Sequence, residues 1–231
     1  KTHRKKLYLL NNYLKNINTP LMKIQVEQLP KKMNIYTFDL GNSNVSAYCW
    51  TKDGVGKEIS WDQKEFQNGV CVSSNVGKKN AALPIDTRYV SFNGEKIFCK
   101  MPVHYSKNLG VDRLLFALSI YSKIDRTNES KYLLIDAGTF LTVDLLGNNG
   151  FHGGIILPGR KLIQQSYLNG ELLKGFVCDS PYMDHVFPVQ NSRDAVNNSW
   201  EICLQALYQK LISENKIKGI YITGGDYRFQ Q

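Results

Sequence analysis

The sequence has no cysteine pattern that would bind zinc or build a disulfide framework. Its five cysteines are widely spaced and no C-x-x-C pair occurs, which disfavours both structural zinc sites and small disulfide-stabilised folds. We therefore expect free thiols in a reducing compartment. The cysteines are Cys49, Cys71, Cys99, Cys178 and Cys203.

Long apolar segments are also missing. No run approaches the roughly 20 apolar residues that a membrane-spanning helix needs. The basic start of the chain is followed only by "LYLL", which is too short for the core of a signal peptide. We expect a cytoplasmic protein that does not contact a membrane.

Several motifs of common enzyme classes are absent. The chain has neither G-x-x-x-x-G-K-[ST] nor G-x-G-x-x-G, which excludes a P-loop and a Rossmann dinucleotide fingerprint. It also has no G-x-S-x-G and no H-E-x-x-H, which weakens the interpretations as a serine hydrolase or a zinc protease.

Positive charge is concentrated at the start of the chain. The net charge is +9, yet residues 1–32 hold eight basic residues and one acidic residue, so the remainder carries only +2. The body of the protein is therefore not a nucleic-acid binder on charge grounds. We treat residues 1–32 as a basic N-terminal extension and expect Met33 to open the first strand.

What the sequence does contain is one strand ending that occurs twice. The segments "IYTFDLGNSNVSAYCW" (35–50) and "KYLLIDAGTFLTVDLL" (131–146) each reach an aspartate, turn on a glycine and resume as a strand. A further strand in "GIYITGGD" (219–226) ends in two glycines. Because strands and helices alternate along the chain, we expect an α/β fold with an internally duplicated architecture.

The spacing of apolar residues predicts three helices, at 110–123, 160–173 and 192–215. Further strands are expected at 34–40, 43–50 and 69–75. The buried side of the last helix is predicted to consist of Ala195, Trp200, Ile202, Cys203, Leu207 and Leu211.

The repeated turn has the chemistry of a phosphate-binding site. A glycine permits positive φ, so successive N–H groups can converge on an anion, and the hydroxyls and amides that follow can donate to phosphate oxygens. The aspartates would lie where Mg²⁺ bridges phosphates. One such turn alone indicates only turn geometry, whereas two copies and the "TGGD" ending favour an ATP cleft between two related domains.

The segment "LGVDR" lies at the start of a predicted helix and allows two interpretations. Asp112 either caps the helix, with Arg113 an exposed charge, or accepts a proton from a substrate hydroxyl while Arg113 binds an anionic substrate.

Five segments, in this order, resemble the type III pantothenate kinases of the acetate and sugar kinase/Hsp70/actin superfamily. They are "DLGNSN" (39–44), "LGVDR" (109–113), "IDAGTFLTVD" (135–144), "GGIILPG" (153–159) and "TGGD" (223–226). The resemblance implies duplicated ribonuclease H-like (actin-like ATPase) domains, with halves at 33–123 and 124–231 and an ATP cleft between them. It also implies a homodimer that phosphorylates pantothenate to 4'-phosphopantothenate with ATP, the first step of coenzyme A biosynthesis.

The resemblance further implies roles for single residues. Asp112 is the expected catalytic base, Asp136 the ligand of a monovalent cation (K⁺ or NH₄⁺), and Asp39 the ligand of Mg²⁺ through water. The expected ATP-binding residues are Asp39, Gly41, Asn42, Ser43, Asn44, Ser46, Thr139, Gly224 and Gly225. The expected pantothenate-binding residues are Tyr105, Gly110, Val111, Arg113 and Ser192.

Several positions depart from the family pattern. Ser192 stands where the family has a threonine, and Phe140 and Leu141 follow the Gly-Thr of the second turn, where smaller residues are common. Accessory transcription factors of the same family share its signatures. A non-catalytic regulatory member is therefore one alternative, and another small-molecule kinase or a phosphatase of the superfamily is the other.

Overall fold

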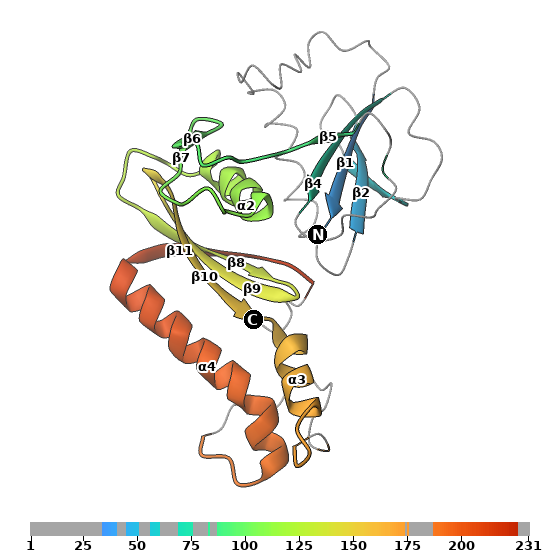
Figure 1. Cartoon of the computed structure of the whole chain (residues 1–231). Coiled ribbons are helices and arrows are strands. Elements are labelled where there is room, and N and C mark those ends of the chain that lie inside the picture. The colour runs from blue at the N-terminus through green and yellow to red at the C-terminus, as the bar shows by residue number, and fades with distance from the viewer. Residues whose placement is uncertain are drawn as a thin grey trace. The chain divides into compact units, whose positions relative to one another are not determined.

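The computed structural model describes residues 34–40, 45–50, 56–60, 69–75, 83, 87–173, 175 and 187–225. The expected basic extension at 1–32 lies outside these residues. The chain divides into two compact units, which Figure 1 shows with labelled elements. The first contains the described residues up to Asn128 together with Leu146–Gly153, and the second contains Glu129–Leu145 and the described residues from Gly154 onward.

The first unit contains a five-stranded sheet in the order β3-β2-β1-β4-β5. Strand β1 is antiparallel to β2 and parallel to β4. The core on one face of this sheet consists of Tyr36, Phe38, Ala47 and Cys71, because alternate residues of a strand point to the same face. The strands are β1 (Asn34–Leu40), β2 (Val45–Trp50), β3 (Gly56–Ile59), β4 (Gly69–Asn75) and β5 (Arg88–Tyr89).

A small antiparallel pair and a helix follow in the same unit. The pair consists of β6 (Ile97–Phe98) and β7 (Met101–Pro102). Helix α2 (Val111–Tyr121) is shorter at both ends than the predicted helix at 110–123. Its residues Leu114 and Ala117 are fully buried, so the helix has a clearly apolar side.

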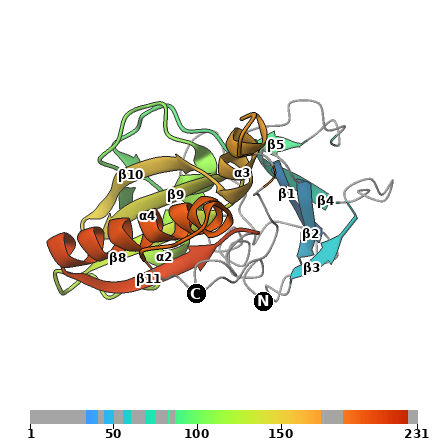
Figure 2. The same ribbon diagram turned by 90° about the horizontal axis from the view of Figure 1, so that it is seen from below.

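The second unit is built on a four-stranded sheet in the order β10-β9-β8-β11, in which β8 and β11 are parallel. The last residues of β9 and the first of β10 belong to the first unit. Helix α4 lies along one face of this sheet (Figures 1 and 2), and α3 packs against α4. The elements are β8 (Lys131–Ala137), β9 (Phe140–Gly147), β10 (Gly150–Pro158), α3 (Arg160–Leu168), α4 (Ser192–Asn215) and β11 (Ile217–Thr223).

The core of this unit forms between the sheet and α4. Leu133, Ile135 and Ala137 of β8 cluster with Leu141 and Val143 of β9 and with a leucine of the helix. That helix residue is Leu204, which is 2% exposed. The predicted buried side of α4 is partly wrong, because Ala195 and Cys203 are exposed whereas Leu204, which was not predicted, is central.

Helix α4 begins where its sequence provides a cap. The side chain of Asn191 accepts a hydrogen bond from the backbone N–H of Asp194 at 2.9 Å, which satisfies one of the free donors of the first turn. The helix ends at Asn215, and the next residue, Lys216, has the left-handed conformation common after a helix. The predicted bounds of this helix, 192–215, are confirmed. No described helix is long and apolar enough to cross a membrane.

Candidate functional site

Asp39 lies one residue before the end of β1, between two serines of neighbouring strands. Ser46 of β2 and Ser74 of β4 both stand opposite it in the register of the sheet. The Ser74 hydroxyl donates a hydrogen bond to Asp39 Oδ1 at 2.8 Å, so one carboxylate oxygen is held in place by the next strand. The other residues expected in this phosphate turn, Gly41 to Asn44, lie outside the described part of the chain.

The negative charge of Asp39 also acts on a neighbouring tyrosine. Burial raises the pKa of Tyr48, and the carboxylates of Glu58 and Asp39 raise it further. Each carboxylate disfavours a second negative charge nearby. Tyr48 therefore keeps its proton at neutral pH.

The second turn joins β8 to β9 and contains Asp136 and Thr139. Asp136 is half-buried and is the last residue but one of β8. The backbone N–H of Gly138 donates to the carbonyl of Phe140 at 3.2 Å, and that of Gly159 donates to the carbonyl of Thr139 at 2.9 Å. One hydrogen bond within the turn and one from the residue that follows β10 therefore stabilise the turn. Phe140, where the sequence departs from the family, has 45% of its surface exposed.

The end of β11 lies beside this turn. Thr223 stands opposite Asp136 in the parallel pairing of β11 with β8, and it is 3% exposed. Gly224 follows with a φ of +103°, and a Cβ there would lie 2.1 Å from the carbonyl oxygen of Ala137. Only glycine allows both this conformation and this close approach of two backbones. Gly224 therefore allows the end of β11 to lie directly against the turn that follows Asp136.

Asp136 and Thr223 share the face of the sheet that points away from α4. The residues that alternate with them, Ile135 and Ile222, pack in the core on the α4 side. Asp144 of β9 lies on the same face as Asp136 and is 2% exposed. Our reading of the sequence did not single out Asp144, although an acid within the apolar run "LTVDLL" signals a buried carboxylate.

Asp112 lies in the first turn of α2, but it does not cap the helix. The N-cap is Gly110, which has extended backbone angles and no side chain that could cap the helix. The interpretation of Asp112 as an N-cap is therefore wrong. Val111 is the first helical residue, so Gly110, Val111, Asp112 and Arg113 form the start of this helix. A carboxylate in a first turn is favoured by the helix dipole.

Arg113 is buried beside two aromatic rings. It is 6% exposed, and its guanidinium carbon lies 5.2 Å from the centre of the Tyr105 ring and 5.9 Å from that of Phe151. These distances are typical of cation–π contacts. The interpretation of Arg113 as an exposed charge is therefore wrong. The structure also brings together two residues expected to bind pantothenate, Arg113 and Tyr105.

The Tyr105 ring lies against a glycine of β10. A Cβ at Gly153 would lie 2.2 Å from Tyr105 Cδ2, so a larger residue there would displace the ring. Next to it, the imidazoles of His104 and His152 stack at 4.8 Å between ring centres. Both donate from Nε2 to Asn149, His104 to the backbone carbonyl at 3.1 Å and His152 to Oδ1 at 2.7 Å.

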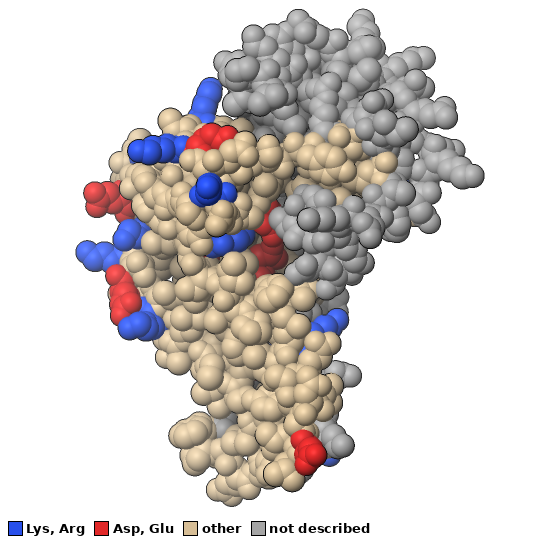
Figure 3. Space-filling view, viewed as in Figure 1, with Lys and Arg blue, Asp and Glu red and all other residues tan. Residues whose placement is uncertain are grey.

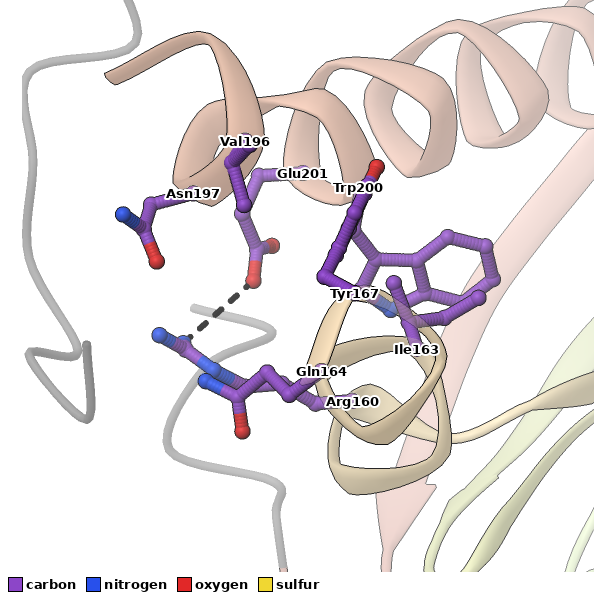
Figure 4. A pocket seen from close by; sticks show the side chains of 8 residues that line it. All are labelled: Arg160, Ile163, Gln164, Tyr167, Val196, Asn197, Trp200 and Glu201. Atoms are coloured by element: carbon purple, nitrogen blue, oxygen red, sulfur yellow. Dashed lines mark ion pairs between the residues drawn. The ribbon is translucent and has the colours of Figure 1, made fainter. Parts of the chain in front are cut away.

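Ser192 is the first residue of α4 and is exposed. One turn further on, a small hollow lies between α3 and α4 (Figure 4). Arg160 and Glu201 form an ion pair across it, at 3.6 Å. The hollow is lined by Arg160, Ile163, Gln164 and Tyr167 of α3 and by Val196, Asn197, Trp200 and Glu201 of α4.

The described residues form neither a single basic patch on the face shown nor a cluster of metal-binding side chains. On the face that Figure 3 shows, their basic and acidic side chains are interspersed and do not gather into one basic patch. Within the described ranges, no group of three or more His, Cys, Asp or Glu side chains is placed to hold a metal ion.

Known proteins share this fold. A solved structure from Campylobacter jejuni, described as a conserved Baf family transcriptional activator, superposes with a TM-score of 0.53 at 24% sequence identity. The match covers 84% of this chain and 85% of that one. At this identity the likeness shows the fold alone.

The sequence relatives are more specific. The family model for type III pantothenate kinase matches residues 59–175, just over half of the chain. The type III pantothenate kinase of Campylobacter hominis is 29% identical over 199 residues, which cover 83% of this chain and 84% of that protein. That of Sulfurimonas denitrificans is 32% identical over 126 residues, which cover 53% and 52%. The chain belongs to the type III pantothenate kinase family.

Proposed function

We propose that this protein transfers the γ-phosphoryl group of ATP to the hydroxyl of pantothenate, forming 4'-phosphopantothenate. The observation that carries the proposal is the membership of the family, together with an aspartate at the end of the first strand in each of two similar sheets. Phosphoryl transfer depends mainly on positioning and on stabilisation of charge, which suits a site built of turns, hydroxyls and carboxylates.

We also propose that the two units are duplicated actin-like domains with the nucleotide between them. Their strand orders support this, because β3-β2-β1-β4 and β10-β9-β8-β11 correspond strand for strand. In each sheet the first strand is parallel to the last of these four, and it carries the aspartate close to its end. In α/β sheets, ligands bind beyond the carboxyl ends of parallel strands.

The proposed nucleotide site uses both turns. Asp39, Gly41 to Asn44, Ser46 and Thr139 would contact the phosphates, and Gly224 and Gly225 would let the adenosine approach the backbone. The oxygen ligands at Asp39 fit Mg²⁺, which proteins commonly hold through one or two carboxylates, with water and substrate phosphate completing the shell. Bound there through water, Mg²⁺ would neutralise charge on the phosphates. K⁺ or NH₄⁺ would be held at Asp136.

The proposed acceptor site lies at the start of α2. Asp112 would accept the proton of the pantothenate hydroxyl while the hydroxyl oxygen forms a bond to the γ-phosphorus of ATP. The bond between the γ-phosphorus and the oxygen that bridges to the β-phosphate breaks, and ADP leaves. Arg113, held against Tyr105 and Phe151, would pair with the carboxylate of pantothenate. Gly110, Val111 and Ser192 would complete the site.

The proposed working form is a homodimer in the cytoplasm. No disulfide joins the described cysteines, Cys49, Cys71, Cys99 and Cys203, which suits a reducing compartment.

The test is a coupled assay of ADP release with and without pantothenate. We expect turnover that requires pantothenate, and its absence would refute the proposed activity and favour a regulatory protein. Asp112→Asn should lower kcat by a factor of about 10² to 10⁴, the usual contribution of a general base, and leave ATP binding intact. Asp125→Asn is a suitable control, because Asp125 is an exposed carboxylate that accepts hydrogen bonds from Thr127 and Asn128 of its own loop. Full activity of Asp112→Asn would refute the role of the base.

A further inference from the structure

The two sheets place a hydroxyl residue opposite each strand-end aspartate. In the first sheet, Ser74 of β4 stands opposite Asp39 of β1. In the second, Thr223 of β11 stands opposite Asp136 of β8. Both pairings are parallel, and the strands occupy corresponding places in the two strand orders. The two pairs, Asp39–Ser74 and Asp136–Thr223, can therefore be compared atom by atom.

The hydroxyls of the two pairs differ in their hydrogen bonding. Ser74 Oγ donates to Asp39 Oδ1 at 2.8 Å, so this pair is closed by a direct bond. Thr223 Oγ1 is buried and has no hydrogen-bond partner among the residues that the structure describes. The residue is only 3% exposed, so bulk water does not replace the missing partner. A buried hydroxyl without a partner loses its hydration and gains nothing in return.

The surroundings of Thr223 Oγ1 favour a cation over an anion as the missing partner. The carboxylate of Asp136 is its neighbour across the strand pair, and the buried Asp144 lies on the same face of the sheet. The Asp136 carboxylate opposes a phosphate oxygen at this position and attracts a positive ion. A threonine hydroxyl offers two lone pairs, and hard cations prefer oxygen ligands of this kind.

We propose that Thr223 Oγ1 and the Asp136 carboxylate together bind the monovalent cation. The inference rests on the proposed function, which assigns K⁺ or NH₄⁺ to Asp136, and it adds Thr223 as a second ligand from this chain. In the first sheet the corresponding hydroxyl, that of Ser74, is already bonded to Asp39, so we place the monovalent cation at the second sheet.

The experiment measures the midpoint of urea unfolding of the full chain at equal ionic strength in choline chloride, sodium chloride and potassium chloride, without substrates. Thr223→Val keeps the size and branching of the side chain and removes the hydroxyl, whereas Thr223→Ser keeps the hydroxyl. Ser74→Ala is the matched control, because it removes the corresponding hydroxyl of the first sheet.

We expect potassium to raise the midpoint of the wild-type protein above its value in choline. Thr223→Val should unfold at the wild-type midpoint or later in choline, and should need about tenfold more potassium, or more, for the same rise. Thr223→Ser should respond to potassium as the wild type does. Ser74→Ala should lose stability equally in all three salts and keep its potassium response.

Three outcomes would overturn the proposal. The first is a wild-type protein that potassium does not stabilise. The second is a Thr223→Val variant that keeps the full potassium response. The third is a loss of stability in Thr223→Val that is as large in choline as in potassium, which would show that Thr223 bonds to Asp136 directly, as Ser74 does to Asp39.

These outcomes are separable from failure of the proposed function. The unfolding measurement uses no pantothenate, and ADP release is assayed separately. A potassium response that depends on Thr223, without pantothenate-dependent turnover, would refute the kinase activity and support the cation site. Pantothenate-dependent turnover in a protein whose unfolding midpoint does not respond to potassium would support the kinase activity and refute the cation site.

Discussion

Replacing Gly224 with alanine tests how closely the end of β11 packs against the turn after Asp136. The substitution has two separate costs. An L-residue must adopt a φ of +103°, and its Cβ must fit where the carbonyl oxygen of Ala137 lies 2.1 Å away and the carbonyl carbon 2.4 Å away. Both obstacles are backbone atoms, so no side chain can rotate to make room.

The size of the effect follows from these two costs. A residue held in a sparsely populated backbone region costs about 1–3 kcal/mol. Forcing an extra methyl group into a filled space costs about 1–3 kcal/mol more. We therefore expect Gly224→Ala to lower the free energy of unfolding by about 2–6 kcal/mol, a large share of the about 5–15 kcal/mol that holds a typical domain folded.

The neighbouring glycine is the control. A Cβ at Gly225 would meet no atom within 4 Å, and its φ lies outside the range that strains an L-residue. Gly225→Ala should therefore change the free energy of unfolding by no more than about 0.5 kcal/mol. Urea unfolding followed by circular dichroism measures both variants. Equal stability of the two would refute the close packing of Gly224 against Ala137.

Two further predictions concern α4. Asn191→Ala removes the side chain that accepts from the Asp194 N–H, and should lower the free energy of unfolding by about 1 kcal/mol in urea unfolding; no change would show that this cap is not formed. Burial, and secondarily the Glu201 carboxylate, raises the pKa of Tyr208 above its ordinary value of 10.0, so the folded protein should lose stability as the pH rises above 10, where only the unfolded chain ionises. Tyr208→Phe should make the loss of stability between pH 9 and 11 smaller. Part of the loss should remain in this variant, because the pKa of Tyr48 is also raised. Identical dependence of stability on pH in the wild type and in Tyr208→Phe would refute the burial of the Tyr208 phenol.

Much of the secondary structure could be predicted because it depends on local patterns. The bounds of β1, β4 and α4 agree with the predicted segments at 34–40, 69–75 and 192–215. The short strands β5, β6 and β7 were not predicted, since a two-residue strand is defined by its partner and not by its own sequence. The buried side of α4 was partly mistaken because apolar residues occur on several sides of this helix, and the sheet selects the side that carries Leu204.

In the candidate site, too, the residues that depend on local sequence could be predicted and the contacts between distant segments could not. The aspartates and glycines of the two turns could be found because each lies in a short, recognisable segment. Ser74 and Thr223 could not be assigned as partners of those aspartates, because a one-residue change of register would place each on the opposite face of its sheet. The cation–π contact of Arg113 with Tyr105 and Phe151 likewise depends on packing between segments distant in sequence.

The two parallel strand pairs also differ in how early they can form during synthesis. Asp39 and Ser74 are 35 residues apart, so their pairing needs only a short stretch of nascent chain. Asp136 and Thr223 are separated by β9, β10, α3 and α4, and closing this longer loop has a larger entropic cost. The first sheet can therefore assemble while the ribosome is still adding residues. The strand pair of Asp136 must wait until β11, the last described strand, has left the exit tunnel, so the second half of the site is completed last.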